Sequence, residues 1–378
     1  MSSSIAASRI AVSLATARAL RVRLVLGIPQ GNEETLKIFA CWARSGGGQA
    51  PEWVVERWAR VGGNDNNDGA ERAPRCGATG GSRYRHRRAG DGGAALLVPH
   101  WSTPRRFAVS MPYAPLDGRD WRFTMGLRPL DESRWLEFDD RAHDERALKD
   151  SLLAAHYDEV VAVDERADAA SRELLDVIVA HLALYFPHQR REVDPHEHPI
   201  VAASRLVQED LCVLERRDAW RLSAACVCFP SRWRLASKLG ATLDGIHAPV
   251  PLYDELLAAP TNAFFDRLRV GRAFWRLNWT LLDSPALHQP TSERRAPSGS
   301  LHDWFFRVER QTLRRLPDSG AAVFTIRTYV DSAAALVARD ETFGPSLWRA
   351  LHTAPSSVQE YKGWVGVAER LSRALKGE

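Results

Sequence analysis

The sequence predicts an α+β fold in which a run of strands is enclosed by helices. Alternating or continuous apolar positions mark strand-like segments, and apolar residues at helical spacing precede and follow them. The strand-like segments are 205–214, 220–229, 273–282, 305–313 and 321–330. The helical segments are 144–156, 164–186, 333–352 and 357–375.

The last two strand-like segments are predicted to pair as an antiparallel hairpin. Residues 315–320 lie between them and place proline, aspartate and glycine where a turn needs them. Each arm carries polar residues on one face: Arg307, Glu309 and Gln311 on the first, and Thr325, Arg327 and Tyr329 on the second. The register decides which of these faces meet, and the sequence alone leaves it open.

Other strand-like segments are also unusually polar, with Gln208, Glu209, Asp210, Arg276 and Asn278 among their residues. One interpretation is a solvated sheet face, which antiparallel sheets tolerate. The other is a face that lines a ligand site. Its arginines would then suit an anionic ligand such as a carboxylate or a phosphate.

The stretch 222–251 combines a buried strand with a proline-rich segment around one histidine. Small apolar residues on both faces of 222–229 predict burial on both sides, and 231–238 is predicted to be a short helix. His247 precedes two prolines, which leave its loop few conformations. Such a loop could mount an axial metal ligand, or it could be a packed turn with a hydrogen-bonded histidine.

The composition, 45% hydrophobic and 26% charged, describes a globular protein with a substantial core. No run of 18 apolar residues exists, so the sequence predicts no membrane span. The net charge of +4 comes from residues 1–100, which hold 14 basic and 8 acidic residues, against 37 and 39 in the remaining 278. A nearly neutral body argues against nucleic-acid binding. The five cysteines form no CxxC pair, which indicates buried thiols in a reducing compartment.

Residues 1–100 differ in kind from the rest, which predicts a low-order N-terminal extension followed by one domain over 101–378. Residues 61–95 are rich in glycine, asparagine and arginine and cannot bury enough apolar surface to order themselves. Residues 1–31 contain four arginines, several serines and no acid, as transit peptides do, although a disordered start is the simpler interpretation. The expected compartment is the cytoplasm, or the mitochondrion if 1–31 is a transit peptide.

Several strings of residues, in consistent order, resemble one protein family. They are FTMGLRPLDESRWLEFD (123–139), VQEDLCVL (207–214), CFPSRWRLASKLG (228–240), IHAPVP (246–251), RLNWTL (276–281), RVERQTLRRLP (307–317) and VFTIRTYV (323–330). On these strings the chain is identified as a member of the heme-dependent oxidative N-demethylase alpha subunit-like family, from about residue 111 to about residue 365. The resemblance implies a PAS-like fold, an antiparallel sheet of about five strands flanked by helices, that binds heme b.

The resemblance also implies an activity, the oxidative removal of a methyl group from a small methylated amine with release of formaldehyde. The reaction uses O₂ and electrons from a separate NAD(P)H-dependent flavin and iron–sulfur reductase. Because this chain has no GxGxxG after a strand and no cysteine cluster, it would depend on that redox partner. The alternative is a non-catalytic PAS-like sensor of heme or another small ligand.

Candidate site residues lie within the matching strings. Histidine is the usual proximal ligand for O₂ chemistry, and among histidines in the matching strings His247 is the only one inside a rigid motif, so it is expected to bind the iron. Four basic residues are candidates to pair with the heme propionates: Lys238, Arg307, Arg310 and Arg327. Glu309 and Gln311 are candidates to orient the amine or an iron-bound oxygen. For each, a role in the core or at the surface stays open.

Overall fold

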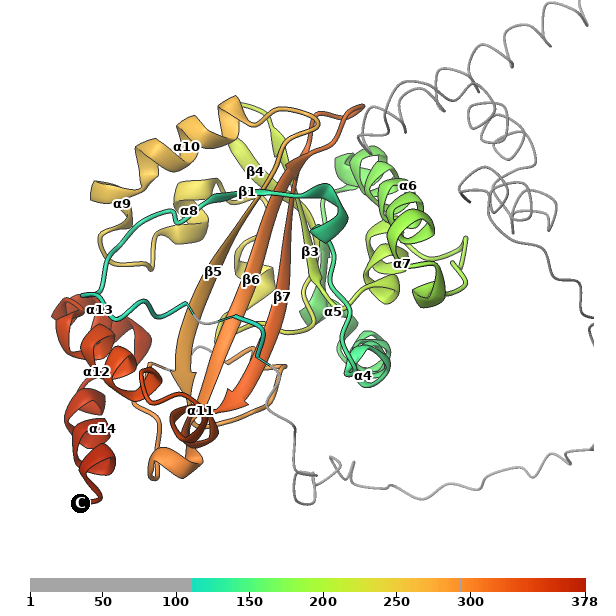
Figure 1. Ribbon diagram of the computed structural model, residues 1–378. Helices are drawn as coiled ribbons and strands as arrows, with labels where there is room; N and C mark the ends of the chain where they lie inside the picture. The colour runs from blue at the N-terminus through green and yellow to red at the C-terminus, as the bar shows by residue number, and fades with distance from the viewer. Residues whose placement is uncertain (1–110, 114, 292–293) are drawn as a thin grey trace, which may run out of the picture. The chain divides into compact units, whose positions relative to one another are not determined.

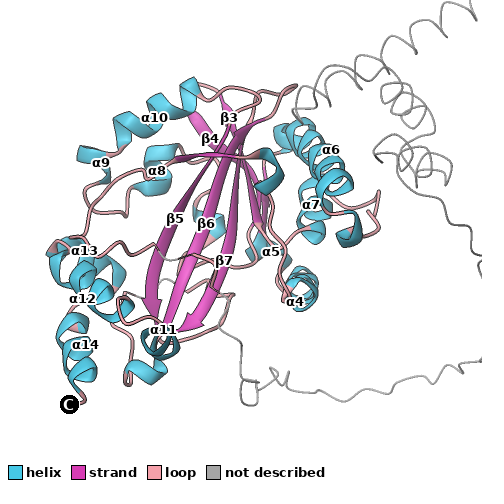
Figure 2. Cartoon of the chain, in the orientation of Figure 1, coloured by secondary structure: helices cyan, strands magenta, loops and turns pink. Residues whose placement is uncertain are grey.

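A single antiparallel sheet forms the centre of the structure, a computed structural model that describes residues 111–378 except 114 and 292–293 (Figure 1). Within these residues the sheet has seven strands in the order β1-β5-β6-β7-β3-β4-β2. The strands are β1 (Arg128–Leu130), β2 (Val161–Val163), β3 (Asp210–Arg216), β4 (Trp220–Cys226), β5 (Ala273–Leu282), β6 (Phe305–Arg315) and β7 (Ala322–Ser332). The helices that flank the sheet confirm the α+β class (Figure 2).

The expected number of about five strands is wrong, because the sheet has seven. The five predicted segments correspond to β3 through β7, and the two that were missed are β1 and β2. Each of these has three residues, which is too short for alternation to show. Residues 205–206, predicted to begin a strand, instead end helix α7 (Pro199–Leu206).

The predicted hairpin is confirmed as β6 and β7, and their register decides which side chains share a face. Arg310 lies opposite Arg327, and Glu309 lies opposite Thr328. Because paired residues point to the same side of a sheet, Arg310 and Arg327 occupy one face. Arg307, Glu309 and Gln311 occupy the other. We call these the α6 face and the α8 face, after the helices that cover them.

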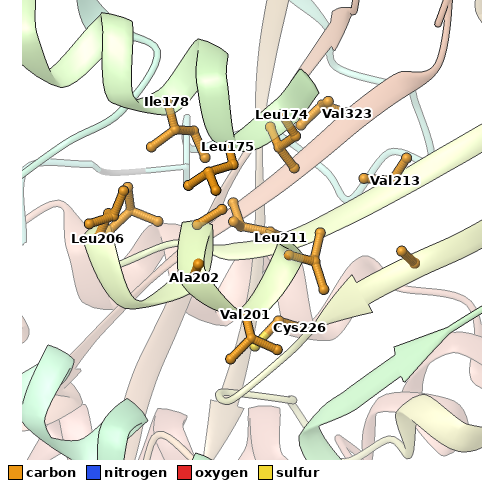
Figure 3. Packing of buried hydrophobic residues seen from close by; sticks show 14 of the residues in the cluster. Leu174, Leu175, Ile178, Val201, Ala202, Leu206, Leu211, Val213, Cys226 and Val323 are labelled. Carbon is orange, nitrogen blue, oxygen red and sulfur yellow. The ribbon is translucent and has the colours of Figure 1, made fainter. Parts of the chain in front are cut away.

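The α6 face is covered near β3 and β4 by helices at the right of Figure 1: α4 (Ala142–Ala155), α5 (Tyr157–Val160), α6 (Asp168–Tyr185) and α7. Leu174 and Ile178 of α6 pack in one apolar core with Leu211 and Val213 of β3 (Figure 3). Cys226 lies in the same core, so its thiol is buried as the sequence predicts.

The C-terminal helices cover the rest of the α6 face: α11 (Ala333–Arg339), α12 (Phe343–Thr353), α13 (Ser356–Lys362) and α14 (Val367–Lys376). Phe306 and Val308 of β6 pack here with Leu347 and Trp364. The predicted helix 357–375 is interrupted at Gly363, whose φ is +67°. A side chain there would collide with the Arg295 carbonyl, so the break requires glycine.

The α8 face is covered by three short helices from the connection between β4 and β5: α8 (Leu243–His247), α9 (Tyr253–Leu256) and α10 (Ala258–Arg267). Leu243 and Phe265 pack here against Leu313 of β6. The predicted helix 231–238 is wrong, since only Leu235–Ser237 forms a 3₁₀ turn. Arg232 has a φ of 60°, a left-handed conformation that a right-handed helix excludes.

Buried arginines attach the segment 132–145 to the α6 face. Arg327 binds Asp139 at 2.7 Å and Glu145 at 2.6 Å, and Arg310 donates to the Trp135 carbonyl at 3.2 Å. Charge-assisted bonds of this kind offset the cost of removing a guanidinium from water. These bonds connect residues 132–139, part of the first matching string, to β6 and β7, which contain the last two.

The predicted extension over residues 1–100 lies outside the described residues. Within the part that the structure describes, no helix is long and apolar enough to cross a membrane.

We predict that Arg327→Met lowers the free energy of unfolding by about 3–5 kcal/mol, because it leaves the buried Glu145 without its cation. Burial already raises the pKa of Glu145, and Arg327 opposes that rise. Denaturation in guanidinium chloride measures the change. The matched control is Arg349→Met, which breaks an exposed pair with Asp120 and should cost less than about 1 kcal/mol. Equal losses in the two variants would contradict the assigned role of Arg327.

Candidate functional site

His247 is the last residue of α8, so the prediction that it stands in a proline-bounded loop is corrected. Thr242 begins the helix by accepting a hydrogen bond from the Gly245 amide at 3.1 Å. Leu243, one turn before the histidine, is buried in the core of the α8 face. The two prolines follow the helix, and the packed turn fixes the position of the half-buried imidazole.

The His247 ring is held on one nitrogen and one face. Its Nδ1 lies 2.8 Å from the Leu243 carbonyl, which can only accept, so Nδ1 carries the hydrogen and Nε2 carries the lone pair. The ring stacks on Tyr253 with centroids 4.5 Å apart. Burial lowers the pKa of His247, and although the Leu243 bond opposes this, the Arg276 and Lys238 charges lower it further. A neutral imidazole with Nδ1 anchored is the form that binds a metal through Nε2.

Lys238 lies beside this helix. Its Nζ donates to the Ile246 carbonyl at 2.6 Å, and burial lowers the pKa of the lysine. The bond stabilises the C-terminal end of α8, where a cation is favourable. Lys238 thus positions the residue before His247.

A polar cluster lies on the α8 face of β5 and β6, where it contains Arg276, Asn278, Glu309 and Gln311, and Lys362 of α13 joins it at the edge of β5. Glu309 Oε2 accepts from the amides of Gln311 at 2.9 Å and Asn278 at 3.3 Å. Lys362 Nζ donates to the Trp279 carbonyl at 2.8 Å and lies 3.5 Å from Asn278 Oδ1. Two amides therefore hold one carboxylate in a fixed orientation.

Arg276 connects this cluster to His247 through its charge. Burial lowers the pKa of Arg276, and the Glu309 carboxylate opposes that fall. The same guanidinium lowers the pKa of His247. The two predicted catalytic residues, Glu309 and Gln311, therefore lie on the same side of the sheet as the predicted iron ligand.

Lys362 is a member of the cluster that the sequence did not indicate. It ends α13, 47 residues after the end of β6, and no motif marks it. Burial lowers its pKa to about 8, while Glu309 raises it and Arg276 lowers it. The alternation of Arg276 and Asn278 with apolar residues in RLNWTL indicated a polar strand face, but it did not show which face of the sheet that would be.

Arg307 also lies on the α8 face, but its guanidinium is occupied. It is fully buried and donates to the carbonyls of Phe229 at 2.6 Å and Leu287 at 3.1 Å. Arg307 therefore connects the residues just after β4 to the segment that follows β5.

Arg310 and Arg327 lie on the opposite face from His247. Both are buried and donate to the segment 132–145 or its ion-pairing groups. The structure thus separates the four predicted propionate partners, with Lys238 and Arg307 on the histidine side and the other two behind the sheet.

The described residues contain no group of three or more His, Cys, Asp or Glu side chains arranged to hold a metal ion. A heme iron needs only one or two axial side chains, because the macrocycle supplies the other ligands. A cysteine thiolate is the other common axial ligand. Cys226 and Cys228 belong to the core of the α6 face, and Cys212 is buried in the core of the α8 face.

Fold and site together define an α+β sheet protein in which one anchored histidine lies on the same side of the sheet as a polar cluster. A model of the family described as haem-dependent oxidative N-demethylase, alpha subunit-like, matches residues 126–372, and the chain belongs to this family. The match begins just before β1, ends within α14, and confirms the resemblance carried by the seven strings. The family name associates its members with heme and with oxidoreductase chemistry.

We predict that the His247 imidazole is the Nδ1–H tautomer and titrates below the ordinary pKa of 6.5. The folded ring then binds a proton less readily than the unfolded one. Its contribution to stability is therefore complete above pH 6.5 and is lost as the pH falls below that value. Long-range ¹H–¹⁵N correlation spectra across pH measure both properties. An Nε2–H tautomer, or a midpoint at or above 6.5, would contradict the site described here.

Proposed function

We propose that this chain is a heme-dependent oxidoreductase that removes a methyl group from a small methylated amine. Its family membership supports the chemistry. The observation that carries the proposal is the His247 imidazole, neutral and anchored at Nδ1, with no hydrogen-bond partner for Nε2 among the described residues.

The overall reaction balances as a monooxygenation. The amine, O₂, two electrons and two protons give the demethylated amine, formaldehyde and water. Bound heme would supply the activation of O₂. The electrons would come from a separate reductase with NAD(P)H, flavin and an iron–sulfur centre. Cys212, Cys226 and Cys228 are buried single thiols, so none is available to bind such a centre.

The residues around His247 suit a bound heme. His247 would hold the iron through Nε2, with the Leu243 carbonyl fixing the tautomer and Tyr253 fixing the ring plane. Lys238 holds the end of α8 in place. Arg307 holds the neighbouring segments through backbone carbonyls. We leave Arg310 and Arg327 out of the proposed heme site, because both are occupied on the α6 face.

Glu309 would orient the substrate. A small secondary amine is a cation at neutral pH, and a carboxylate held by the Asn278 and Gln311 amides is a fixed acceptor for its N–H groups. Holding the nitrogen in this way directs the methyl group, and Gln311 keeps the carboxylate from rotating.

The PAS-like fold is part of this proposal. Numbered in chain order, the five long strands β3 to β7 lie in the order 2-1-5-4-3, and the helices between the second and third cover one face. This arrangement supports the assignment. The compartment and the role of residues 1–100 stay predictions.

We predict that the purified protein binds heme and shows a Soret band, which His247→Ala shifts or abolishes and added imidazole restores. The matched control is His352→Ala, whose ring stacks on Trp348 in the exposed part of α12 and should leave the spectrum unchanged. Formaldehyde release from a methylated amine with supplied electrons tests catalysis. Heme binding without formaldehyde from any amine would favour the sensor. A His247→Ala spectrum identical to wild type would remove His247 as ligand.

We predict that Glu309→Gln lowers kcat/KM for a methylated amine roughly ten- to hundred-fold, the loss of one charge-assisted hydrogen bond. The Soret band should not change, because Glu309 is not the proposed iron ligand. Glu369→Gln, an exposed carboxylate on α14, is the control and should keep full activity. Loss of the Soret band in Glu309→Gln would show that the residue supports the heme site instead of the substrate.

A further inference from the structure

Arg276 is the one arginine of β5 to β7 whose side chain has no hydrogen bond or ion pair among the described residues. The others reach defined acceptors: Arg307, Arg310, Arg314, Arg315 and Arg327. The Nε of Arg276 is buried and unsatisfied, as are the Nε atoms of Arg307, Arg310, Arg314 and Arg327. Those four arginines bind protein acceptors through their terminal nitrogens, whereas among the described residues the terminal nitrogens of Arg276 have no partner. Arg276 is only half-buried, so its unpaired terminal N–H groups are free to bind an anion.

The charges around Arg276 do not balance. Glu309 is the one carboxylate of the described residues whose charge acts on Arg276, and its charge also acts on Lys362 and on Arg307. Both Asn278 and Gln311 direct their amides at that carboxylate, which leaves less of it for the cations. The cluster therefore holds two cations against one anion.

The part of β5 around Arg276 is partly open to solvent. Among the described residues, β1 pairs only with residues 273–275 of β5, and no other strand pairs with that strand's outer edge. Residues 274–280 of β5 are all partly exposed, whereas most of β6 is buried. Arg276 lies opposite Gln311 in the register, on the face that carries α8 and His247.

We propose that Arg276, with Lys362 beside it, binds a carboxylate of the ligand that this site takes. A guanidinium matches a carboxylate with two parallel hydrogen bonds, and one N–H of Lys362 is left after its two contacts. This inference rests on the proposed function. Two sources share this chemistry, a propionate of the heme and the carboxylate of an N-methylated amino acid, and the test separates them.

The test titrates the full-length wild type and Arg276→Gln with heme and with heme dimethyl ester, following the Soret band. If a propionate is the partner, the variant binds heme roughly ten- to hundred-fold more weakly, whereas the ester binds both proteins alike. If a substrate carboxylate is the partner, heme affinity is unchanged, and the variant loses affinity for N-methylglycine but not for N-methylethylamine. Either result supports the carboxylate site.

Arg272→Gln is the matched control, since Arg272 is exposed just before β5 and should change nothing. Arg276→Lys keeps the charge without the paired donors and should fall between wild type and Arg276→Gln, which covers the case of a misfolded glutamine variant. Unchanged affinity of the Arg276 variants for all four ligands would overturn the proposal.

Failure of the proposed function is recognised separately, because wild type would then bind no heme. The carboxylate site is still tested in that case by the melting temperature of the protein without heme. Sodium propionate should raise it above sodium chloride at equal ionic strength in wild type and not in Arg276→Gln. Equal shifts in both proteins would reject the site independently of heme.

Discussion

The register between β6 and β7 is the constraint on which the rest of the structure depends. Both strands are rich in polar residues that alternate along the chain, so a slip by one residue would exchange the side chains of the two faces. The pairing of Arg310 with Arg327 sends both to the α6 face and leaves Arg307, Glu309 and Gln311 on the other. Everything that distinguishes the histidine side from the packed side follows from this assignment.

The two faces use the same residue types for different purposes. On the α6 face, buried guanidinium groups meet carboxylates and carbonyls of the segment 132–145, and the face is closed by helices. On the α8 face, the terminal nitrogens of Arg307 bind backbone carbonyls, while those of Arg276 bind no described group. The role of an arginine in this sheet therefore depends less on its residue type than on whether its N–H donors are already bonded.

Sequence reasoning succeeded where a signal was long and local. The five long strands extend over seven residues or more, and the hairpin has its turn residues in place, so periodicity and turn chemistry were sufficient. It failed for β1 and β2, which are too short to show an alternating pattern. It also failed for α8, a helix of five residues, because the prolines that follow it predicted a loop. The choice of His247 came from the family resemblance together with its rigid setting.

The candidate site was only partly accessible from sequence for a different reason. Whether Arg307 and Arg327 face the same ligand depends on pairing between strands, which no local pattern encodes. Lys362 approaches Asn278 across 84 positions of sequence, and only the packing of α13 brings it there. Polar alternation showed that a face was special, but three-dimensional contacts decide which residues share it.

The position of Lys362 also has a consequence for how the protein is made. The carbonyl that Lys362 covers belongs to the outer edge of β5, and the lysine ends the helix before the Gly363 break. During synthesis β5 leaves the ribosome some eighty residues before Lys362, so the edge of β5 stays uncovered until α13 has been made. An open strand edge can pair with other chains, and α13 protects the edge of β5 from such pairing once it has been synthesised.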